Sequence, residues 1–211
     1  MEVALYGATG MIGSRVLQEL LRRGHHVVAI VRDPRKLDVH HAHLRVEQGD
    51  VTQPRSIAGC VAGCDAVISA FSPRDGDNAL YMDVTQALFA GLKKADVNRL
   101  IAVGGAGSLC VAPGVKLVDS PDFPAEYRDR ALAQRAELQA YRAHNELDWT
   151  YICPSAVIRP GERTGQFRMA DDELIVGENG KSEISAEDFA VAVVNELEKP
   201  KHHRKRFTVG Y

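Results

Sequence analysis

The chain has 211 residues, of which 45% are hydrophobic and 26% are charged, and its formal net charge at pH 7 is −2. This length predicts one domain, and the ordinary globular composition excludes disordered, collagen-like and low-complexity proteins. Because the chain is weakly acidic and has no basic block, a dedicated nucleic-acid-binding protein is disfavoured.

The first half of the chain alternates short apolar runs with helical patterns. We expect strands at 3–6, 26–31, 44–47, 65–70 and 99–103, and helices at 12–21, 53–59 and 77–95. This alternation predicts crossover connections and a parallel sheet with helices on both faces. Because such crossovers are right-handed, the expected fold is α/β, with a single doubly wound parallel sheet of the Rossmann type.

The second half is less regular. Residues 104–124 contain four glycines and three prolines, and a loop of this length is usually functional. After it we expect a helix at 125–147, a strand at 149–153, an irregular stretch at 154–161, a small hairpin of 167–169 with 174–176, a helix opened by a capping box at 185–188, and a last strand at 206–209. No repeat or linker is visible, so we expect one domain over 1–211, with 154–184 forming a small substrate-side region.

Apolar runs, cysteines and histidines exclude several other classes. No apolar run approaches the ~20 residues that span a bilayer, and the N-terminus shows no secretion signal. Cys60, Cys64, Cys110 and Cys153 lack paired CxxC spacing, and the histidines of 40–43 are expected in a solvated loop. We therefore expect a cytoplasmic protein with reduced thiols and without a metal site or membrane segment.

The segment Gly7-Ala8-Thr9-Gly10-Met11-Ile12-Gly13 lies between the first predicted strand and the first predicted helix. In such a unit the first glycine makes the tight turn, the second leaves room for a pyrophosphate, and the third lets the helix pack closely. Free amides at the helix N-terminus then hold the anion. The spacing predicts a dinucleotide site, with a turn that binds no ligand as the alternative. The turn lacks the Gly-Lys-Ser/Thr ending of a triphosphate-binding P-loop.

The end of the second predicted strand indicates which dinucleotide is bound. A carboxylate there would bind the ribose diol of NAD, but Arg32 occupies this position, and Arg35 and Lys36 follow. A guanidinium group matches a 2′-phosphate with two hydrogen bonds, so NADP(H) is the favoured cofactor. NAD(H) stays possible because Asp33 could turn inward, and Arg32 could instead be a solvated charge at the strand end.

These motifs resemble the atypical short-chain dehydrogenase/reductases. Gly7, Gly10 and Gly13, followed by Arg-Asp-Pro at 32–34, are most similar to the NmrA-like and flavin-reductase-like (biliverdin reductase B-like) NAD(P)H-binding group. The resemblance covers nearly the whole chain, and its early motifs are more specific than its later ones. The late helix start at 185–190 also resembles the family pattern.

The resemblance implies a set of cofactor-binding residues. Residues 50–51 match the family's adenine-contacting segment, residues 70–71 match the segment that lines the ribose, and residues 154–156 match the segment beside the nicotinamide. The full implied set is Gly7, Thr9, Gly10, Met11, Ile12, Gly13, Arg32, Asp50, Val51, Ala70, Phe71, Gly104, Pro154, Ser155 and Ala156.

The chain departs from ordinary members of this superfamily, because none of its tyrosines is followed by a lysine four residues later. The tyrosine acid whose pKa a lysine lowers is therefore missing, which puts alcohol–carbonyl redox chemistry in doubt. Two catalytic candidates remain. Ser108 lies where the family has its active-site serine, and Tyr127 starts the helix after the long loop. A plain loop hydroxyl and an ordinary helix residue are the respective alternatives.

The missing tyrosine–lysine pair suits an acceptor that is reduced with little general-acid catalysis. In such a reaction the reduced nicotinamide supplies the hydride and the protein orients the reactants. We therefore predict an NADPH-dependent reductase that transfers hydride to a flavin- or quinone-like acceptor. The alternatives are a redox sensor or regulator that binds the dinucleotide without turnover, and an epimerase or isomerase that retains NAD. We expect a small-molecule partner, no nucleic-acid or membrane partner, and a monomer or homodimer.

Overall fold

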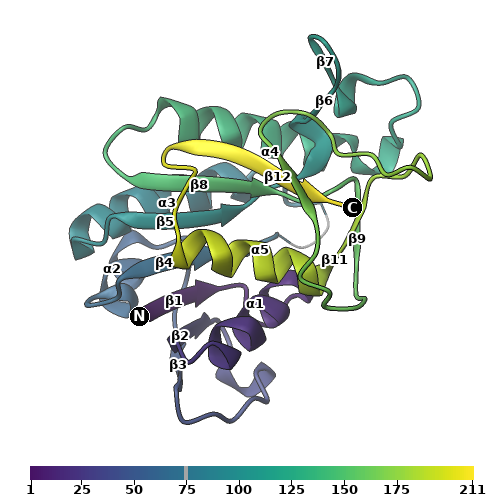
Figure 1. Ribbon diagram of the computed structural model, residues 1–211. Helices are drawn as coiled ribbons and strands as arrows, with labels where there is room; N and C mark the ends of the chain where they lie inside the picture. The colour runs from purple at the N-terminus through teal and green to yellow at the C-terminus, as the bar shows by residue number, and fades with distance from the viewer. Residues whose placement is uncertain (74–75) are drawn as a thin grey trace.

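A central sheet of eight strands runs through the part of the chain that the computed structural model describes, residues 1–73 and 76–211 (Figure 1). Its strands are β1 (Glu2–Tyr6), β2 (His26–Val31), β3 (Leu44–Gln48), β4 (Ala66–Ser69), β5 (Arg99–Val103), β8 (Asp148–Cys153), β10 (Arg168–Ala170) and β12 (Lys205–Gly210). Their order is β10-β12-β8-β5-β4-β1-β2-β3, and every neighbouring pair is parallel except β10 with β12. The strand order therefore reverses between β1 and β4.

Helices cover both faces of this sheet (Figure 1). On one face, α1 (Met11–Arg22) packs beside α5 (Ala186–Glu198). On the other face, α3 (Leu80–Ala95) packs between α2 (Pro54–Val61) and α4 (Ala125–Ala143). The predicted α/β fold, a doubly wound sheet with helices on both faces, is confirmed.

Burial on both faces of the sheet explains why its strands are continuous apolar runs in the sequence. In β1, Val3 and Leu5 belong to the core shared with α1 and α5, whereas Ala4 and Tyr6 belong to the core shared with α2 and α3. All four side chains are buried. A strand of this kind reads as a continuous apolar run, which is why β2 and β5 have the bounds that the sequence predicts.

The pairing of the short strands in the second half differs from the prediction. The expected hairpin of 167–169 with 174–176 is wrong, because β10 pairs antiparallel with β12. The Leu174 N–H instead donates to the Cys110 carbonyl (2.8 Å). Strands of three residues depend on distant partners, and a local pattern does not reveal such partners.

Two stretches that we expect to be irregular contain short strands. Within 104–124, β6 (Cys110–Ala112) and β7 (Val115–Lys116) form a hairpin that projects from the rest of the molecule (Figure 1). After β8, β9 (Val157–Arg159) pairs in parallel with β11 (Glu183–Ser185). This second pair fastens the chain after β8 to the start of α5.

The helix α4 ends at Ala143, before its predicted end at residue 147. The ring of His144 stacks on Phe89 at 3.9 Å, and the His144 carbonyl accepts a hydrogen bond from Trp149 Nε1 (3.1 Å). These contacts turn the chain into β8 earlier than the helical pattern indicates.

In the part of the chain that the structure describes, no helix is long and apolar enough to cross a membrane. In the same part of the chain, no three His, Cys, Asp or Glu side chains form a group that could hold a metal ion. All four cysteines of the described chain are free thiols.

Candidate functional site

The turn between β1 and α1 is built from closely packed glycines. Gly7 has a φ of +80°, and a Cβ atom there would overlap the carbonyl of Ala70. A Cβ atom on Gly13 would overlap the carbonyl of Gly7, so the helix packs directly on the turn. Gly10 is the N-cap of α1, and its N–H donates to the Gly7 carbonyl (2.9 Å). The next amides of α1 have no intrahelical acceptor, so they are available to an anion.

A cavity of about 230 Å³ opens beside this turn, at the carboxyl ends of β1, β2 and β4. We call it the switch-point cavity, because the strand order reverses there, which is where open α/β sheets bind ligands. Its lining comprises Tyr6, Gly7, Thr9, Gly10, Ile30, Val31, Arg32, Gly49, Val51, Ala70, Phe71 and Ser72. Of the predicted cofactor-binding residues, it brings together Gly7, Thr9, Gly10, Arg32, Val51, Ala70 and Phe71.

Two neighbouring residues at the end of β2 have different partners. Arg32 is exposed at the switch-point cavity, and its guanidinium group makes no hydrogen bond or ion pair with the described residues. The Asp33 carboxylate instead accepts two hydrogen bonds from the Arg35 guanidinium, at 2.9 and 3.1 Å. These bonds from Arg35 hold the pKa of Asp33 below its usual value. Arg32 is therefore the available charge, and Asp33 is turned toward Arg35.

Other predicted residues lie near the switch-point cavity without lining it. Residues 11–12 form the first turn of α1. The Asp50 carboxylate accepts hydrogen bonds from the N–H and hydroxyl of Thr52, at 2.9 and 2.7 Å, and so fixes the turn before α2. Gly104 follows β5, and a Cβ atom there would overlap the ring of Tyr151.

A second cavity, of about 390 Å³, lies beyond the carboxyl ends of β5 and β8. We call it the loop cavity, because the loops after these strands line it together with the start of α4. Its lining comprises Ala106, Gly107, Leu117, Ser120, Asp122, Phe123, Pro124, Tyr127, Arg130, Ala131, Gln134, Ala156 and Val157. Most of these side chains are apolar, as in typical small-molecule sites, and the predicted residues Tyr127 and Ala156 are among them.

The hydroxyl groups of Ser108 and Ser155 are both engaged inside the protein. Ser108 is buried, and its oxygen accepts a hydrogen bond from the Arg206 guanidinium (3.2 Å). Ser155 is also buried, and its hydroxyl donates to the Val209 carbonyl (2.9 Å). Pro154, beside it, is buried as well. Ser108 does not line the loop cavity, so its direct role stays a prediction.

The sequence reasoning missed part of the loop cavity. Phe123 and Gln134 line it, and neither belongs to a family motif named above. The spacing of Tyr127, Ala131 and Gln134 places these residues on one face of α4, a signal that could have identified this wall. Glu137 continues the same face and is buried.

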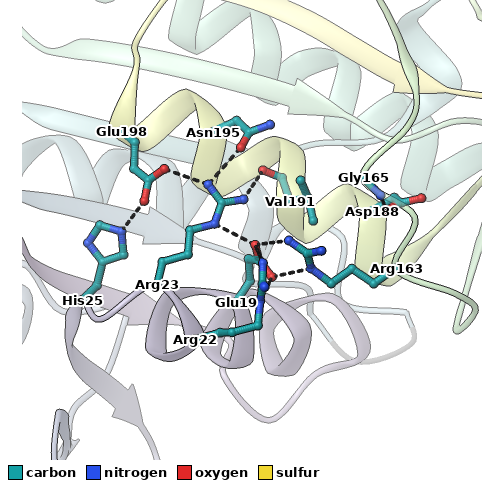
Figure 2. Close-up of polar contacts among 10 residues, drawn as sticks. All are labelled: Glu19, Arg22, Arg23, His25, Arg163, Gly165, Asp188, Val191, Asn195 and Glu198. Atoms are coloured by element: carbon teal, nitrogen blue, oxygen red, sulfur yellow. Dashed lines mark hydrogen bonds and ion pairs between the residues drawn. The ribbon is translucent and has the colours of Figure 1, made fainter.

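A buried glutamate ties the chain after β9 to α1 (Figure 2). The Glu19 carboxylate of α1 accepts two hydrogen bonds from Arg163, at 2.9 and 3.0 Å, and further ones from Arg22 and Arg23. Burial alone would raise the pKa of Glu19, but hydrogen bonds from Arg163, Arg22 and Arg23 hold it far below its usual value. Glu19 is therefore a charged anchor for the segment around Arg163.

Asp188 on α5 provides a second attachment (Figure 2). Its N–H donates to the Ser185 hydroxyl (3.0 Å), which is one half of the predicted capping box. The other half is not formed, because the Ser185 N–H donates to the Tyr211 hydroxyl (3.2 Å). The Asp188 carboxylate accepts hydrogen bonds from the Gly165 N–H (2.7 Å) and from the hydroxyls of Thr164 and Tyr211. In this way residues 163–165 are attached to both helices of this face.

The chain is similar to a known family over most of its length. A sequence model of the family described as NAD(P)H-binding matches residues 7–200. Among curated relatives, the uncharacterized protein YwnB of Bacillus subtilis is 39% identical over 212 aligned positions. That alignment covers 99% of this chain and 98% of YwnB.

Two solved structures share the fold and much of the sequence. A candidate epimerase from Bacteroides thetaiotaomicron is 42% identical, with a TM-score of 0.93 over 100% of this chain and 96% of that protein. A candidate NADH-flavin reductase from Streptococcus pneumoniae is 33% identical, with a TM-score of 0.89 over 100% of this chain and 99% of that protein. The names of these two proteins indicate different reactions on one shared fold.

Proposed function

This chain belongs to the NAD(P)H-binding family, and from that premise we propose that it is an NADPH-dependent reductase of flavin- or quinone-like acceptors. The observation that carries the proposal is the placement of two cavities at the same edge of one parallel sheet. The switch-point cavity suits the adenosine half of a dinucleotide, and the loop cavity suits a small apolar acceptor. The similarity to a candidate NADH-flavin reductase supports the same reaction class.

The cofactor would be held by its two anionic groups. The amides at the start of α1 would bind the pyrophosphate, and Gly10 keeps side-chain atoms away from it. Arg32 would bind the 2′-phosphate of NADPH, which is supported by its exposed guanidinium and by the engagement of Asp33 with Arg35. A guanidinium group at this position favours NADPH over NADH.

The acceptor would lie against the apolar wall of the loop cavity. When bound, the reduced nicotinamide supplies the hydride. Phe123 and Tyr127 would cover the acceptor and exclude water from it, and the hydroxyl of Tyr127 would provide a proton. Residues 154–156 lead from β8 toward the same cavity, where Ala156 forms part of the wall. Ser108 is buried outside the cavity lining, so it would join the site only if its hydroxyl turned into the loop cavity.

The test is steady-state oxidation of NADPH with added FMN or menadione, measured against the same mixture without protein. Turnover above the protein-free rate supports the reductase. Tight NADPH binding without turnover of either acceptor would overturn it and favour a dinucleotide-binding sensor. We further propose that the protein acts in the cytoplasm on a small molecule, as a monomer or homodimer.

A second candidate function follows from the similarity to a candidate epimerase. An epimerase of this superfamily retains its cofactor, so the purified protein would carry nicotinamide. Its absorbance spectrum after denaturation distinguishes the two functions. Stoichiometric NAD in the freshly purified protein would favour the epimerase over the reductase.

A further inference from the structure

Three glutamate side chains are almost fully buried in the described chain, and they differ in their partners: Glu19, Glu137 and Glu196. Glu19 is paired with three arginines. Glu196 is paired with Arg99 (3.2 Å) and His202 (2.8 Å). Glu137, on α4, forms no ion pair with any of the described residues. Because a buried carboxylate normally requires a cation, this difference sets Glu137 apart.

Two hydroxyl groups contact the Glu137 carboxyl. Thr85 Oγ1, on α3, lies 3.1 Å from one oxygen, and the Tyr151 hydroxyl, on β8, donates to the other at 2.7 Å. Thr85 Oγ1 also lies 2.8 Å from the Tyr81 carbonyl, and its single proton cannot serve both acceptors. The Tyr151 hydroxyl likewise lies 3.3 Å from the Gln134 carbonyl. The Glu137 carboxyl therefore shares both of its donors with backbone carbonyls and has no cation, which is poor compensation for a buried negative charge.

The surroundings of Glu137 favour the neutral form of its carboxyl. Burial raises the pKa of Glu137 to about 7, although the hydrogen bonds from Tyr151 and Thr85 act against the increase. The titratable groups that face its carboxyl are Tyr81 from α3, Tyr141 from α4, and Tyr151 and Cys153 from β8. Each of these groups is a neutral acid. Arg130 acts on Tyr81 and Arg206 acts on Cys153, but neither arginine lowers the pKa of Glu137, so ionisation would place a negative charge in the core without an ion pair.

Glu137 is linked to the backbone between β5 and the loop cavity. The ring of Tyr151 fills the space where a side chain on Gly104 would lie. The amide of Gln134, one turn before Glu137 on α4, fills the corresponding space beside Gly105. These two glycines lead from β5 into the wall of the loop cavity. The backbone at 104–105 therefore rests on Tyr151 and Gln134.

We propose that Glu137 is a positioning residue whose neutral form holds Tyr151 beneath Gly104 and so fixes the backbone that leads from β5 into the loop cavity. Ionisation leaves an unpaired charge in the core, which draws in water or shifts α4 relative to Tyr151, so acceptor turnover falls as the pH rises. Glu137 acts through Tyr151 and has no contact with the reacting molecules. The inference rests on the proposed function.

The test is the pH profile of NADPH oxidation, from pH 6 to 8.5, with whichever of FMN and menadione is reduced. The wild-type rate should fall by roughly 30-fold over this range, as for one group with a pKa near 7. Glu137→Gln has an amide that cannot ionise, so its rate should stay within about threefold of its value at pH 6. The same decline in both proteins, or a flat wild-type profile, would overturn the proposal.

Two further variants keep the test independent of whether Glu137→Gln folds. Thr85→Val retains the carboxyl but removes a donor to its charged form, so the decline should move to higher pH. If the rate of Thr85→Val falls over the same pH range as that of the wild type, the proposal is contradicted. Glu146→Gln is the matched control, because Glu146 is an exposed glutamate that pairs with Lys93 (2.8 Å). Its profile should follow the wild type.

Infrared difference spectroscopy separates this inference from the proposed function, because it needs no acceptor. Between pH 6 and 8.5 the wild type should lose the C=O band of a protonated carboxyl, and Glu137→Gln should show no such change. Absence of the band in the wild type, or the same change in Glu137→Gln, overturns the inference. If the band is present but neither acceptor turns over, the proposed function fails and the role of Glu137 in turnover fails with it.

Discussion

The guanidinium group of Arg32 is the charge available at the switch-point cavity, since that of Arg35 is bonded to Asp33. We predict that Arg32→Ala weakens NADPH binding by roughly tenfold to a hundredfold, because a charge-assisted hydrogen bond is worth about 1.5–3 kcal/mol. NADH binding should barely change. Calorimetric titration with both dinucleotides measures this. Arg45→Ala, on the edge strand β3, removes a contact to Glu2 and is the control. Equal losses for both cofactors would make Arg32 structural.

A substitution at Gly10 should affect cofactor binding without affecting the fold. A Cβ atom there would lie 3.3 Å from the Gly7 carbonyl, a tight but tolerable contact, whereas one on Gly13 would overlap that carbonyl. We predict that Gly10→Val keeps the fold but loses NADPH binding, because its methyl groups occupy the pyrophosphate position. Circular dichroism and an NADPH titration check both parts. Gly59→Ala, with open space around the added atom, should bind as the wild type does. A folded Gly10→Val with normal affinity would refute the cofactor site.

The ionisation of Glu137 should also make the free energy of unfolding depend on pH. Its pKa is about 7 in the folded protein, against an ordinary value of 4.5. Between these values the unfolded chain releases the proton and the folded chain keeps it, so wild-type stability falls as the pH rises. The advantage of Glu137→Gln in free energy of unfolding should therefore grow by about 3 kcal/mol between pH 4 and 8. Urea unfolding at the two pH values measures the difference, and a constant difference contradicts the assignment.

Among the elements, the segment 163–165 depends on its attachments to α1 and α5 (Figure 2). We predict that Arg163→Met costs about 1 kcal/mol, because Glu19 keeps Arg22 and Arg23. Amide hydrogen exchange at 163–165 should become faster. Arg159→Met is the matched control, because this exposed arginine pairs only with Glu183 among the described residues (3.0 Å). Unchanged exchange in Arg163→Met would show that other contacts hold the segment.

The sequence predicts those helices and strands whose bounds are set by the residue pattern of the element itself. The strands β2 and β5 are buried on both faces, so their apolar runs set their bounds. The pairing of β10 with β12 was not predictable in this way, because three residues carry little pattern and their partner lies near the end of the chain. The end of α4 at Ala143 depends on a contact of His144 with a different helix.

At the scale of the whole molecule, the loop cavity is formed by segments distant in sequence, and Tyr127 is its most exposed aromatic lining residue. We predict that Tyr127→Ala raises the KM for the acceptor at least about fivefold, because a covering ring is lost, a cost of roughly 1 kcal/mol. The Kd for NADPH should stay within about threefold. Leu132→Ala, on the same helix but outside the cavity lining, is the control. An unchanged KM in Tyr127→Ala would remove this residue from the site.

The two cavities differ in how far the sequence predicts them. The glycine turn and Arg32 lie within a few residues of strand ends, so spacing alone places them at the switch-point cavity. The loop cavity combines Phe123, Gln134 and Val157, which only the folded chain brings together. The burial of Glu137 could not be predicted from the sequence either, because a glutamate in a polar helix is usually exposed to solvent.

The central claim is that this chain places a reduced nicotinamide and an acceptor at one edge of its sheet for direct hydride transfer. An anaerobic single-turnover experiment tests it, in which the protein with bound NADPH, deuterated at the transferred position, is mixed with FMN or menadione. We predict that NADPH oxidation and acceptor reduction occur together, faster than without protein, and that deuterium slows both equally. A stable complex that leaves NADPH and both acceptors unreacted would contradict the claim.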